Sequence, residues 1–306
     1  SEALEVMKNF LKEPNSKGVY IKAEGRLSKE MKERCGVSFV TSEDDWDNGS
    51  CFIFDCNIYE TVLDLMRVLV TKNPESTRYC FVLDSLDGLI MKDDLNKGFE
   101  DAHKVAGGAL LGAKFMQKMS IALAKRGHMA IFISQVRADI KLDPYSKAPV
   151  RQTTATGGNA LLHFANYILE FEPRFKKDLI LENQTQPVDQ QKNKILGHIA
   201  KITVKKSPNE KTNYTLEYPI KYGRKNGTSI WVEKEIIDML YLWGYISKKG
   251  AWISIEEDFV DMLKKNKFEF PEKVQGEPKL NALLESNQDL MNFLIKHFKK
   301  MIYQQS

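Results

Sequence analysis

Short apolar runs alternate with helical segments through residues 1–170, and this alternation predicts the fold class. Runs typical of buried strands occupy residues 18–24, 37–40, 50–54, 80–85 and 129–134. Helices are predicted at residues 2–12, 28–36, 58–70 and 105–126, the third of them capped by Asn57. Strands that are apolar on both faces are typical of a parallel sheet with helices packed on either side. The pattern therefore predicts an α/β core.

After Asn166 the pattern changes to long strand-like runs with few helical signals. These runs lie at residues 165–171, 195–204 and 213–222. The segment 173–194 between the first two is rich in Gln, Lys and Asn, which predicts a surface loop.

A domain boundary is predicted in the segment KYGRKNGTS, which has two glycines and three bases. We therefore expect one domain at residues 1–223 and a small α+β domain at residues 224–306. The sequence of the second domain predicts helices around the aromatic hairpin LWGYISKKGAWISI.

Composition sets broad limits on the class of protein. The 306 residues are 42% hydrophobic and 28% charged, and the net charge of +4 permits a nucleic-acid partner without arguing for one. Four cysteines without a C-x-x-C pair indicate reduced thiols, and the five histidines show no metal-ligand spacing. No run is apolar and long enough for a membrane span, and no signal peptide is readable, so we expect a cytoplasmic protein with no membrane partner.

Three of the predicted core strands end on polar residues that could carry chemistry. One ends on Asp84 and Ser85, another ends on Glu24, and the run AIFISQ ends on Gln135. Ligands of open α/β sheets bind outside the carboxyl ends of the strands, where these side chains would meet. Asp84 could hold a magnesium ion there, whereas the plainer interpretation is a cap of the turn that leaves the strand. For Glu24, an ordinary surface glutamate stays the alternative.

A long polar loop follows Gln135, and its composition suits single-stranded nucleic acid. The loop is net basic, because it has four bases (Arg137, Lys141, Lys147 and Arg151) and two acids (Asp139 and Asp143). Its aromatic ring is Tyr145. Its hydroxyl groups belong to Thr153, Thr154 and Thr156, and its glycines are Gly157 and Gly158. Donors directed at phosphate oxygens, together with a side chain that can stack, bind a single strand without base preference. An ordinary surface loop is the alternative interpretation.

The order of three segments carries a family resemblance. CFVLDS (80–85), AIFISQVR (130–137) and RQTTATGGNALLHFAN (151–166) together resemble the ATPase core of the RecA/UvsX strand-exchange family. The resemblance implies a RecA-like P-loop ATPase fold with ATP and Mg²⁺ as cofactors. In the family pattern, Asp84 would hold the magnesium ion, and Asp84 and Ser85 would bind the cofactor. Glu24 would polarise the attacking water, and Gln135 would sense the γ-phosphate.

The same resemblance implies DNA contacts and a base that acts on a neighbouring subunit. The loop from Arg137 through the TGGN segment to Asn159 would be the main DNA contact, and a shorter DNA loop would contain Asn96, Lys97 and Gly98. Either Lys205 or Lys206 would reach the ATP of a neighbour, much as an arginine finger does, although a solvated pair at a strand end is the plainer interpretation. The C-terminal domain resembles the part of RecA that handles duplex DNA.

The chain departs from the family pattern at several positions. Lys22 replaces an acidic residue two positions before Glu24, and Ser28 and Met31 stand where the family commonly has an acidic residue and an aromatic ring near the adenine. The sequence contains no G-x-x-x-x-G-K-[ST] phosphate loop, and Ser1 would align with the residue directly after its lysine. We therefore expect the 306-residue chain to bind ATP poorly, since the backbone cradle and the lysine for the phosphates are missing.

Three functions remain open. The first is an ATP-dependent DNA recombinase that binds single-stranded DNA as a homo-oligomeric filament, pairs it with homologous duplex DNA and exchanges strands. The second is an ATPase-deficient nucleic-acid-binding or interaction module with the same fold. The third is a helicase-type motor, which the long loop after Gln135 and the aromatic C-terminal domain disfavour. The codons upstream of Ser1 discriminate the first two, because a phosphate-loop motif there supports the recombinase.

Overall fold

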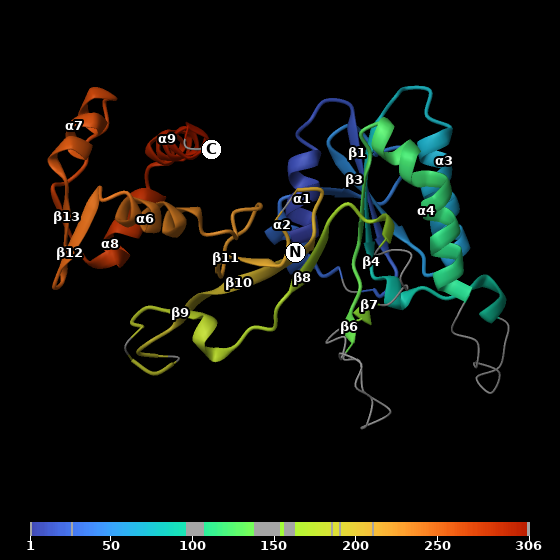
Figure 1. The fold of residues 1–306 in the computed structure, drawn as a ribbon, viewed down its shortest axis with the longest axis horizontal. Coiled ribbons are helices and arrows are strands. Elements are labelled where there is room, and N and C mark those ends of the chain that lie inside the picture. The colour runs from blue at the N-terminus through green and yellow to red at the C-terminus, as the bar shows by residue number, and fades with distance from the viewer. Residues whose placement is uncertain are drawn as a thin grey trace. The chain divides into compact units, whose positions relative to one another are not determined.

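A five-stranded parallel sheet, in the order β2-β3-β1-β4-β5, lies at the centre of the first part of the chain (Figure 1). Its strands are β1 (Ser16–Lys22), β2 (Ser38–Val40), β3 (Ser50–Asp55), β4 (Arg78–Asp84) and β5 (Met129–Phe132). The computed structural model describes residues 2–25, 27–95, 107–137, 154–155, 163–184, 186–189, 191–209 and 211–304. None of the helices in these ranges is both long enough and apolar enough to cross a bilayer.

Helices cover both faces of this sheet, as the apolar strands require. Figure 1 shows α1 and α2 on one side of the sheet and α3 and α4 on the other. Their bounds are Glu2–Phe10, Lys29–Cys35, Tyr59–Thr71 and Gly107–Lys125, in that order. The predicted α/β core is therefore confirmed.

Alternate residues of the central strands enter two separate hydrophobic clusters. One cluster packs β1 and β4 against α3 and α4, and its members include Val19, Ile21, Phe81, Leu83, Val62, Met66 and Met119. The other packs the opposite face against α1 and α2, and its members include Tyr20, Cys51, Cys80, Val82, Leu4, Met7 and Cys35. Because side chains alternate along a strand, residues an even number of positions apart share one of these faces.

Helix α2 is closed at both ends by specific contacts. Ser28 accepts a hydrogen bond from the amide of Met31 at 3.2 Å, and Gly36 ends the helix with a φ of 72°. A distant segment, Arg224–Thr228, packs on this end. The Asn226 amide donates to Glu33 O at 3.0 Å, and a β-carbon on Gly36 would lie 2.7 Å from Asn226 C. Glycine meets both the positive φ and the close approach.

The predicted cap of α3 is wrong. Ile58 occupies the N-cap position, and no side chain caps the helix there. The backbone of Asn57 instead pairs with Ile90, whose amide donates to Asn57 O at 2.8 Å, while the Tyr59 amide donates to Ile90 O at 2.9 Å. A parallel bridge between Ile58 and Ile90 thus holds the start of the helix. The nearby short 3₁₀ helices are η1 (Leu86–Gly88) and η2 (Lys92–Asp94).

A four-stranded sheet follows, built from β8, β9, β10 and β11. Their bounds are Ile168–Phe171, Leu179–Leu181, Ile195–Lys206 and Tyr214–Lys221. The segment 173–194 is more ordered than the predicted surface loop, since it contains β9 and the 3₁₀ helix η4 (Lys176–Asp178). Asn193, only 1% exposed, holds the segment together by donating from Nδ2 to the carbonyl oxygens of Asn183, Gln186 and Pro187.

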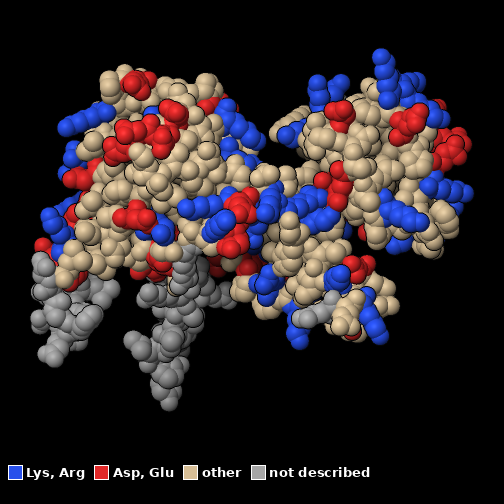
Figure 2. Space-filling model, turned by 180° about the vertical axis from the view of Figure 1, so that it is seen from behind, with Lys and Arg blue, Asp and Glu red and all other residues tan. Residues whose placement is uncertain are grey.

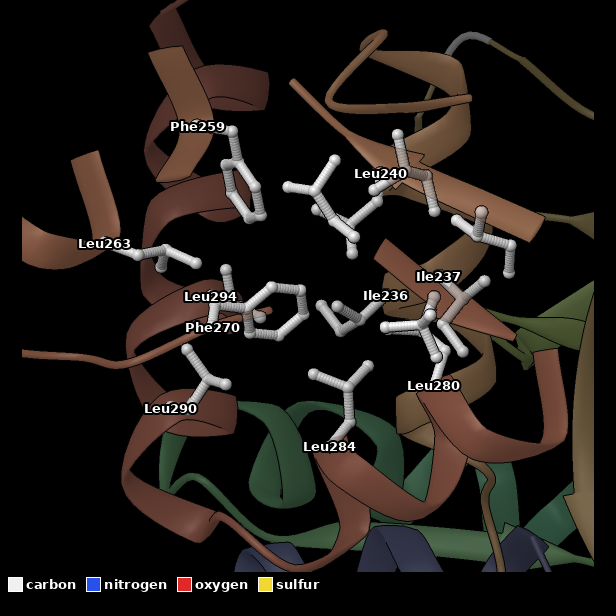
Figure 3. Close-up of a cluster of buried hydrophobic side chains, with 14 of the residues drawn as sticks. Ile236, Ile237, Leu240, Phe259, Leu263, Phe270, Leu280, Leu284, Leu290 and Leu294 are labelled. Carbon is white, nitrogen blue, oxygen red and sulfur yellow. The ribbon is translucent and has the colours of Figure 1, made fainter. Parts of the chain in front are cut away.

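The C-terminal helices surround a three-stranded antiparallel sheet in the order β12-β13-β14. The strands are Ile246–Lys249, Trp252–Ile255 and Lys273–Gln275, and the helices are α6 (Val232–Leu242), α7 (Glu257–Lys265), α8 (Gly276–Glu285) and α9 (Gln288–Gln304). Figure 3 shows their apolar side chains pointing toward one another, among them Leu240, Phe259, Leu263 and Leu294, each fully buried. The predicted helices around an aromatic hairpin are present.

The chain divides into two compact units that interleave in sequence. Unit 1 comprises Ser1–Ile168, Lys205–Asn213 and Arg224–Thr228. Unit 2 comprises Leu169–Val204, Tyr214–Gly223 and Ser229–Ser306. The division into functional domains at residue 223 stays a prediction.

Candidate functional site

The carboxyl ends of β1 and β4 meet at the switch point of the parallel sheet. After β1 the chain runs to β2 and β3 on one side, and it then crosses to β4 and β5 on the other. Lys22 pairs with Asp84, and the amides of Ala23 and Glu24 donate to Asp84 O at 2.9 and 3.3 Å. Open α/β sheets bind their ligands at this point, so Glu24 and Asp84 flank the position where a ligand is expected.

Each of these two carboxylates receives a hydrogen bond from a hydroxyl group of the other strand. The Ser85 hydroxyl, on a residue only 3% exposed, donates to Glu24 Oε1. The Tyr20 hydroxyl donates to Asp84 Oδ2. The peptide bond between Asp84 and Ser85 is cis. The two hydroxyl hydrogen bonds restrain the orientations of both carboxylates.

Tyr20 is a site residue that the sequence analysis missed. Burial, followed by the hydrogen bond to Asp84 and the negative charge of Asp84, raises the pKa of Tyr20 above its ordinary value. The phenol therefore keeps its proton and acts as a donor to the carboxylate. A signal was present in the sequence, because Tyr20 is a polar-tipped residue between the apolar Val19 and Ile21 and lies an even number of positions before Glu24. Its partner could not be inferred without the strand order.

The turn after Asp84 packs directly against Glu24. In η1, a β-carbon on Gly88 would lie 2.6 Å from Glu24 Cγ and 3.1 Å from Ala23 O. Only a glycine permits this close approach without displacing Glu24. Gly88 is a second residue that the sequence analysis did not identify.

Gln135 joins the same edge of the sheet through its backbone. The Ile133 amide donates to Leu83 O at 3.0 Å, and the Leu86 amide donates to Ile133 O at 2.9 Å. The Gln135 amide then donates to Asp87 Oδ2 at 2.7 Å, while the Gln135 side chain is exposed. The Gln135 backbone is thus bound to the turn that follows Asp84 and Ser85, at the same edge of the sheet.

Lys22, which departs from the family pattern, forms an ion pair with Asp55 at the end of β3, which lies beside β1 in the sheet. Its Nζ lies 2.8 Å from Asp55 Oδ1. An acidic residue at position 22 would place two carboxylates side by side, whereas the lysine balances Asp55.

The two predicted trans-acting lysines lie at the end of β10, on a different sheet from Glu24 and Asp84. Lys206 is half-buried, and its Nζ donates to the carbonyl oxygen of His163 at 2.6 Å. Lys205 is exposed. The side chains of Lys205 and Lys206 therefore have different surroundings.

Most of the predicted DNA-contact residues lie outside the described residues. They are Asn96, Lys97, Gly98, Lys141, Tyr145, Lys147, Arg151, Thr156, Gly157, Gly158 and Asn159, and the candidate cofactor residue Ser1 is also outside. The backbone at the two flanks is described. Arg137 in β6 (Val136–Arg137) pairs with Thr154 in β7 (Thr154–Ala155).

Comparison with known proteins decides the family. The sequence matches the family model described as the RecA N-terminal domain over residues 3–223. The chain belongs to the RecA family. This membership confirms the resemblance that the three ordered segments carry.

Individual RecA proteins match most of the chain at low identity. Protein RecA of Frankia alni is 27% identical over 286 residues, which cover 92% of this chain and 68% of that protein. Protein RecA of Bifidobacterium breve is 28% identical over 259 residues, which cover 84% of this chain and 56% of that protein. Protein RecA of Mycobacterium ulcerans is 28% identical over 250 residues, which cover 81% of this chain and 62% of that protein.

The strand-end residues of this RecA-family chain fit a magnesium ion that is shared with phosphate groups. Within the described ranges, no three His, Cys, Asp or Glu side chains are grouped so that they could hold a metal by themselves. Mg²⁺ commonly takes one or two carboxylates and completes its octahedron with water and substrate phosphates. The half-buried carboxylate of Asp84 and the hydroxyl of Ser85 supply oxygen donors of this kind. The Ser85 hydroxyl donates its proton to Glu24, and its lone pairs remain for an ion or a water.

Proposed function

We propose that this protein is an ATP-dependent DNA recombinase that forms a homo-oligomeric filament on single-stranded DNA, pairs it with homologous duplex DNA and exchanges strands. One observation carries the proposal. At the switch point of a RecA-family core, two carboxylates on neighbouring strands are each fixed by a hydroxyl group. Water activation and metal binding need carboxylates that are held in this way.

Glu24 is proposed to activate the attacking water. A general base must lie within hydrogen-bond reach of the proton that it removes, and its orientation must be fixed. The Ser85 hydroxyl and the contact of Gly88 supply that orientation for Glu24. We therefore assign to Glu24 the role of accepting the proton of the attacking water.

Asp84 and Ser85 are proposed to hold Mg²⁺ together with ATP. The bound ion would supply positive charge to the phosphate oxygens of the nucleotide. Asp84 is held on its backbone side by the amides of Ala23 and Glu24, so its carboxylate extends from a fixed strand end. No gross rearrangement of β1 or β4 is needed for this role.

Gln135 is proposed to relay the state of the nucleotide to DNA. A neutral amide can donate to a phosphate oxygen and accept from backbone, so it can join two conformations without transferring a proton. Its backbone is bound to Asp87 on one side and continues directly into β6 on the other. A displacement of Gln135 would reach the paired residues Arg137 and Thr154, the two flanks of the proposed DNA loop.

On the face that Figure 2 shows, the charges favour a local DNA contact over a broad basic surface. Figure 2 shows Lys and Arg side chains interspersed with Asp and Glu on the visible face of each unit. Single-strand binding then depends on the net basic segment between Arg137 and Gly158. For the base that acts on a neighbour, Lys205 and Lys206 both stay candidates, since both lie at the end of β10.

The test uses the protein translated from its complete gene. We expect single-stranded DNA to stimulate ATP hydrolysis, and we expect the protein to pair a labelled single strand with homologous duplex. Gln135→Ala should keep basal hydrolysis and lose the stimulation, because the amide link to the loop is removed. Gln288→Ala is the matched control, since it removes an exposed amide in unit 2 and should leave the stimulation intact.

Other outcomes overturn specific parts of the proposal. DNA binding without hydrolysis would identify a nucleic-acid-binding module. Hydrolysis that drives duplex unwinding without pairing would identify a helicase-type motor. Undiminished stimulation in Gln135→Ala would remove Gln135 from the sensor role.

A further inference from the structure

The Tyr20 side chain is an unusual member of the hydrophobic cluster between the sheet and helices α1 and α2. It is only 2% exposed, and its ring packs edge-on against Phe39 with the ring centroids 6.1 Å apart. The neighbouring strand residues in this cluster are Cys51, Cys80 and Val82. A phenylalanine would suit these apolar surroundings, whereas a tyrosine brings a hydroxyl group that must find a partner.

Strand register explains why that partner is Asp84. In the parallel pair of β1 and β4, Tyr20 lies opposite Val82 and Lys22 lies opposite Asp84. Side chains alternate between the faces, so Tyr20 and Asp84 lie on the same face, two positions apart. The ring spans this offset, and its hydroxyl donates to Asp84 Oδ2.

The hydrogen bond acts on the orientation of the Asp84 carboxylate. Asp84 O already accepts from the amides of Ala23 and Glu24, so β1 fixes its backbone. The Tyr20 hydroxyl fixes the other end of the residue, because it restrains rotation of the carboxylate about the Cβ–Cγ bond. Asp84 Oδ1 is then the oxygen that can take a metal ion or its bound water. Outer residues that orient metal ligands commonly control affinity in this way.

We propose that Tyr20 is the positioning residue for Asp84 and tunes the affinity of the strand-end site for the magnesium–nucleotide complex. This proposal rests on the proposed function, because it assumes that Asp84 binds the ion. Tyr20 itself contacts neither the nucleotide nor the reacting water. It acts through the carboxylate.

The test compares two variants that each remove one buried tyrosine hydroxyl. Tyr20→Phe keeps the ring and deletes the donor to Asp84. Tyr79→Phe is the matched control, since Tyr79 is 9% exposed and lies on β4 in the cluster of the opposite face. For the protein from the complete gene, we would measure the dissociation constant of ATP with Mg²⁺ and with EDTA, and the binding of Mn²⁺ by electron paramagnetic resonance with ATP present.

If Tyr20 positions Asp84, Tyr20→Phe should lose affinity for ATP only when the metal ion is present. In Tyr20→Phe, the affinities for Mg²⁺-ATP and for Mn²⁺ should fall about tenfold. The affinity for ATP in EDTA should not change. A higher Mg²⁺ concentration should restore ATP binding, and Tyr79→Phe should match the wild type in every measurement.

Two results would overturn the proposal, and they are distinguishable. If the wild type binds Mg²⁺-ATP and Tyr20→Phe binds it equally well, Tyr20 has no positioning role, and the proposed function stands. A loss of thermal stability without a change in metal dependence leads to the same conclusion, since a packing role alone would produce it. If the wild type shows no metal-dependent ATP binding, the proposed function and the role of Tyr20 fail together.

Discussion

The strand-end site of unit 1 has half-buried carboxylates and the helical core of unit 2 is fully buried, and different interactions hold the two regions. In the site, the hydroxyl groups of Tyr20 and Ser85 fix the carboxylates of Asp84 and Glu24. In the core of unit 2, apolar side chains of four helices and a small sheet pack together (Figure 3). Hydrogen bonds fix direction and contribute little net free energy, whereas apolar packing contributes free energy without fixing an atom for chemistry.

This difference implies that the two regions fail in different ways. Removing one oxygen atom from the site should change chemistry and leave the protein folded. Removing several carbon atoms from the core of unit 2 should lower the free energy of unfolding. The predictions below separate these two outcomes.

The largest expected effect is on the core of unit 2. Leu240 and Leu242 lie in the same helix, but Leu240 is fully buried and Leu242 is 81% exposed. Leu240→Ala should lower the free energy of unfolding by about 2–5 kcal/mol, because it leaves a cavity. Leu242→Ala should change it by less than about 0.5 kcal/mol. Denaturant titration checks both, and equal losses in the two variants would contradict this account of the core.

The next effect is on the site. Ser85→Ala removes the donor to Glu24 Oε1, so the base loses its orientation and DNA-stimulated hydrolysis should fall about tenfold, the equivalent of about 1.4 kcal/mol. Ser50→Ala is the matched control, because the buried hydroxyl of Ser50 donates to Asp47 O at 2.7 Å, at the other end of β3 from the site. If both serine variants lose the same activity, the effect comes from general packing.

A smaller effect is expected where Arg224–Thr228 packs on α1 and α2, within unit 1. Lys8 is half-buried, and its Nζ donates to Gly227 O at 2.7 Å. Lys8→Met keeps the aliphatic stem and removes the donor, which should cost about 1.5 kcal/mol of unfolding free energy. Lys12→Met, in the exposed turn after the same helix, is the control and should cost less. Chemical denaturation measures both, and no loss in Lys8→Met would show that this contact is dispensable.

A pH dependence of stability is the smallest effect. Burial, followed by the charge of Arg126, lowers the pKa of His128 below its ordinary value of 6.5, and burial also lowers the pKa values of His198 and His297. The unfolded chain therefore binds protons more readily than the folded protein. The contribution of the uncharged histidines to the free energy of unfolding is complete above pH 6.5 and is lost as the pH falls below that value. Unfolding free energies at pH 7.5 and 5.5 check the sign, and greater stability at the lower pH would contradict it.

The sequence predicted the parts of the fold that depend on local pattern. Apolar strands, helical spacing and polar strand ends identified the parallel core, and Glu24, Asp84 and Gln135 lie at its carboxyl edge as expected. Family membership was readable because the motifs occur in a fixed order.

The remaining features depend on contacts between residues that are far apart in sequence. The partner of Tyr20 requires the knowledge that β1 and β4 are neighbours, although β2 and β3 separate them in the chain. The need for glycine at position 88 arises only when η1 packs on Glu24. Asn57 was predicted as a cap from its residue type, but its backbone pairs with Ile90 instead. The strand β9 was hidden in a polar segment because its order comes from pairing with β10.

The central claim is that Glu24 is the base of a nucleotide site formed where β1 and β4 end. The most direct test is the rate of ATP hydrolysis by Glu24→Gln in the protein from the complete gene, with single-stranded DNA present. The amide keeps the size of the side chain and can still accept from Ser85, but it cannot take a proton. We expect hydrolysis to fall at least about a hundredfold while the affinity for Mg²⁺-ATP is unchanged. Hydrolysis at the wild-type rate in Glu24→Gln would contradict the account.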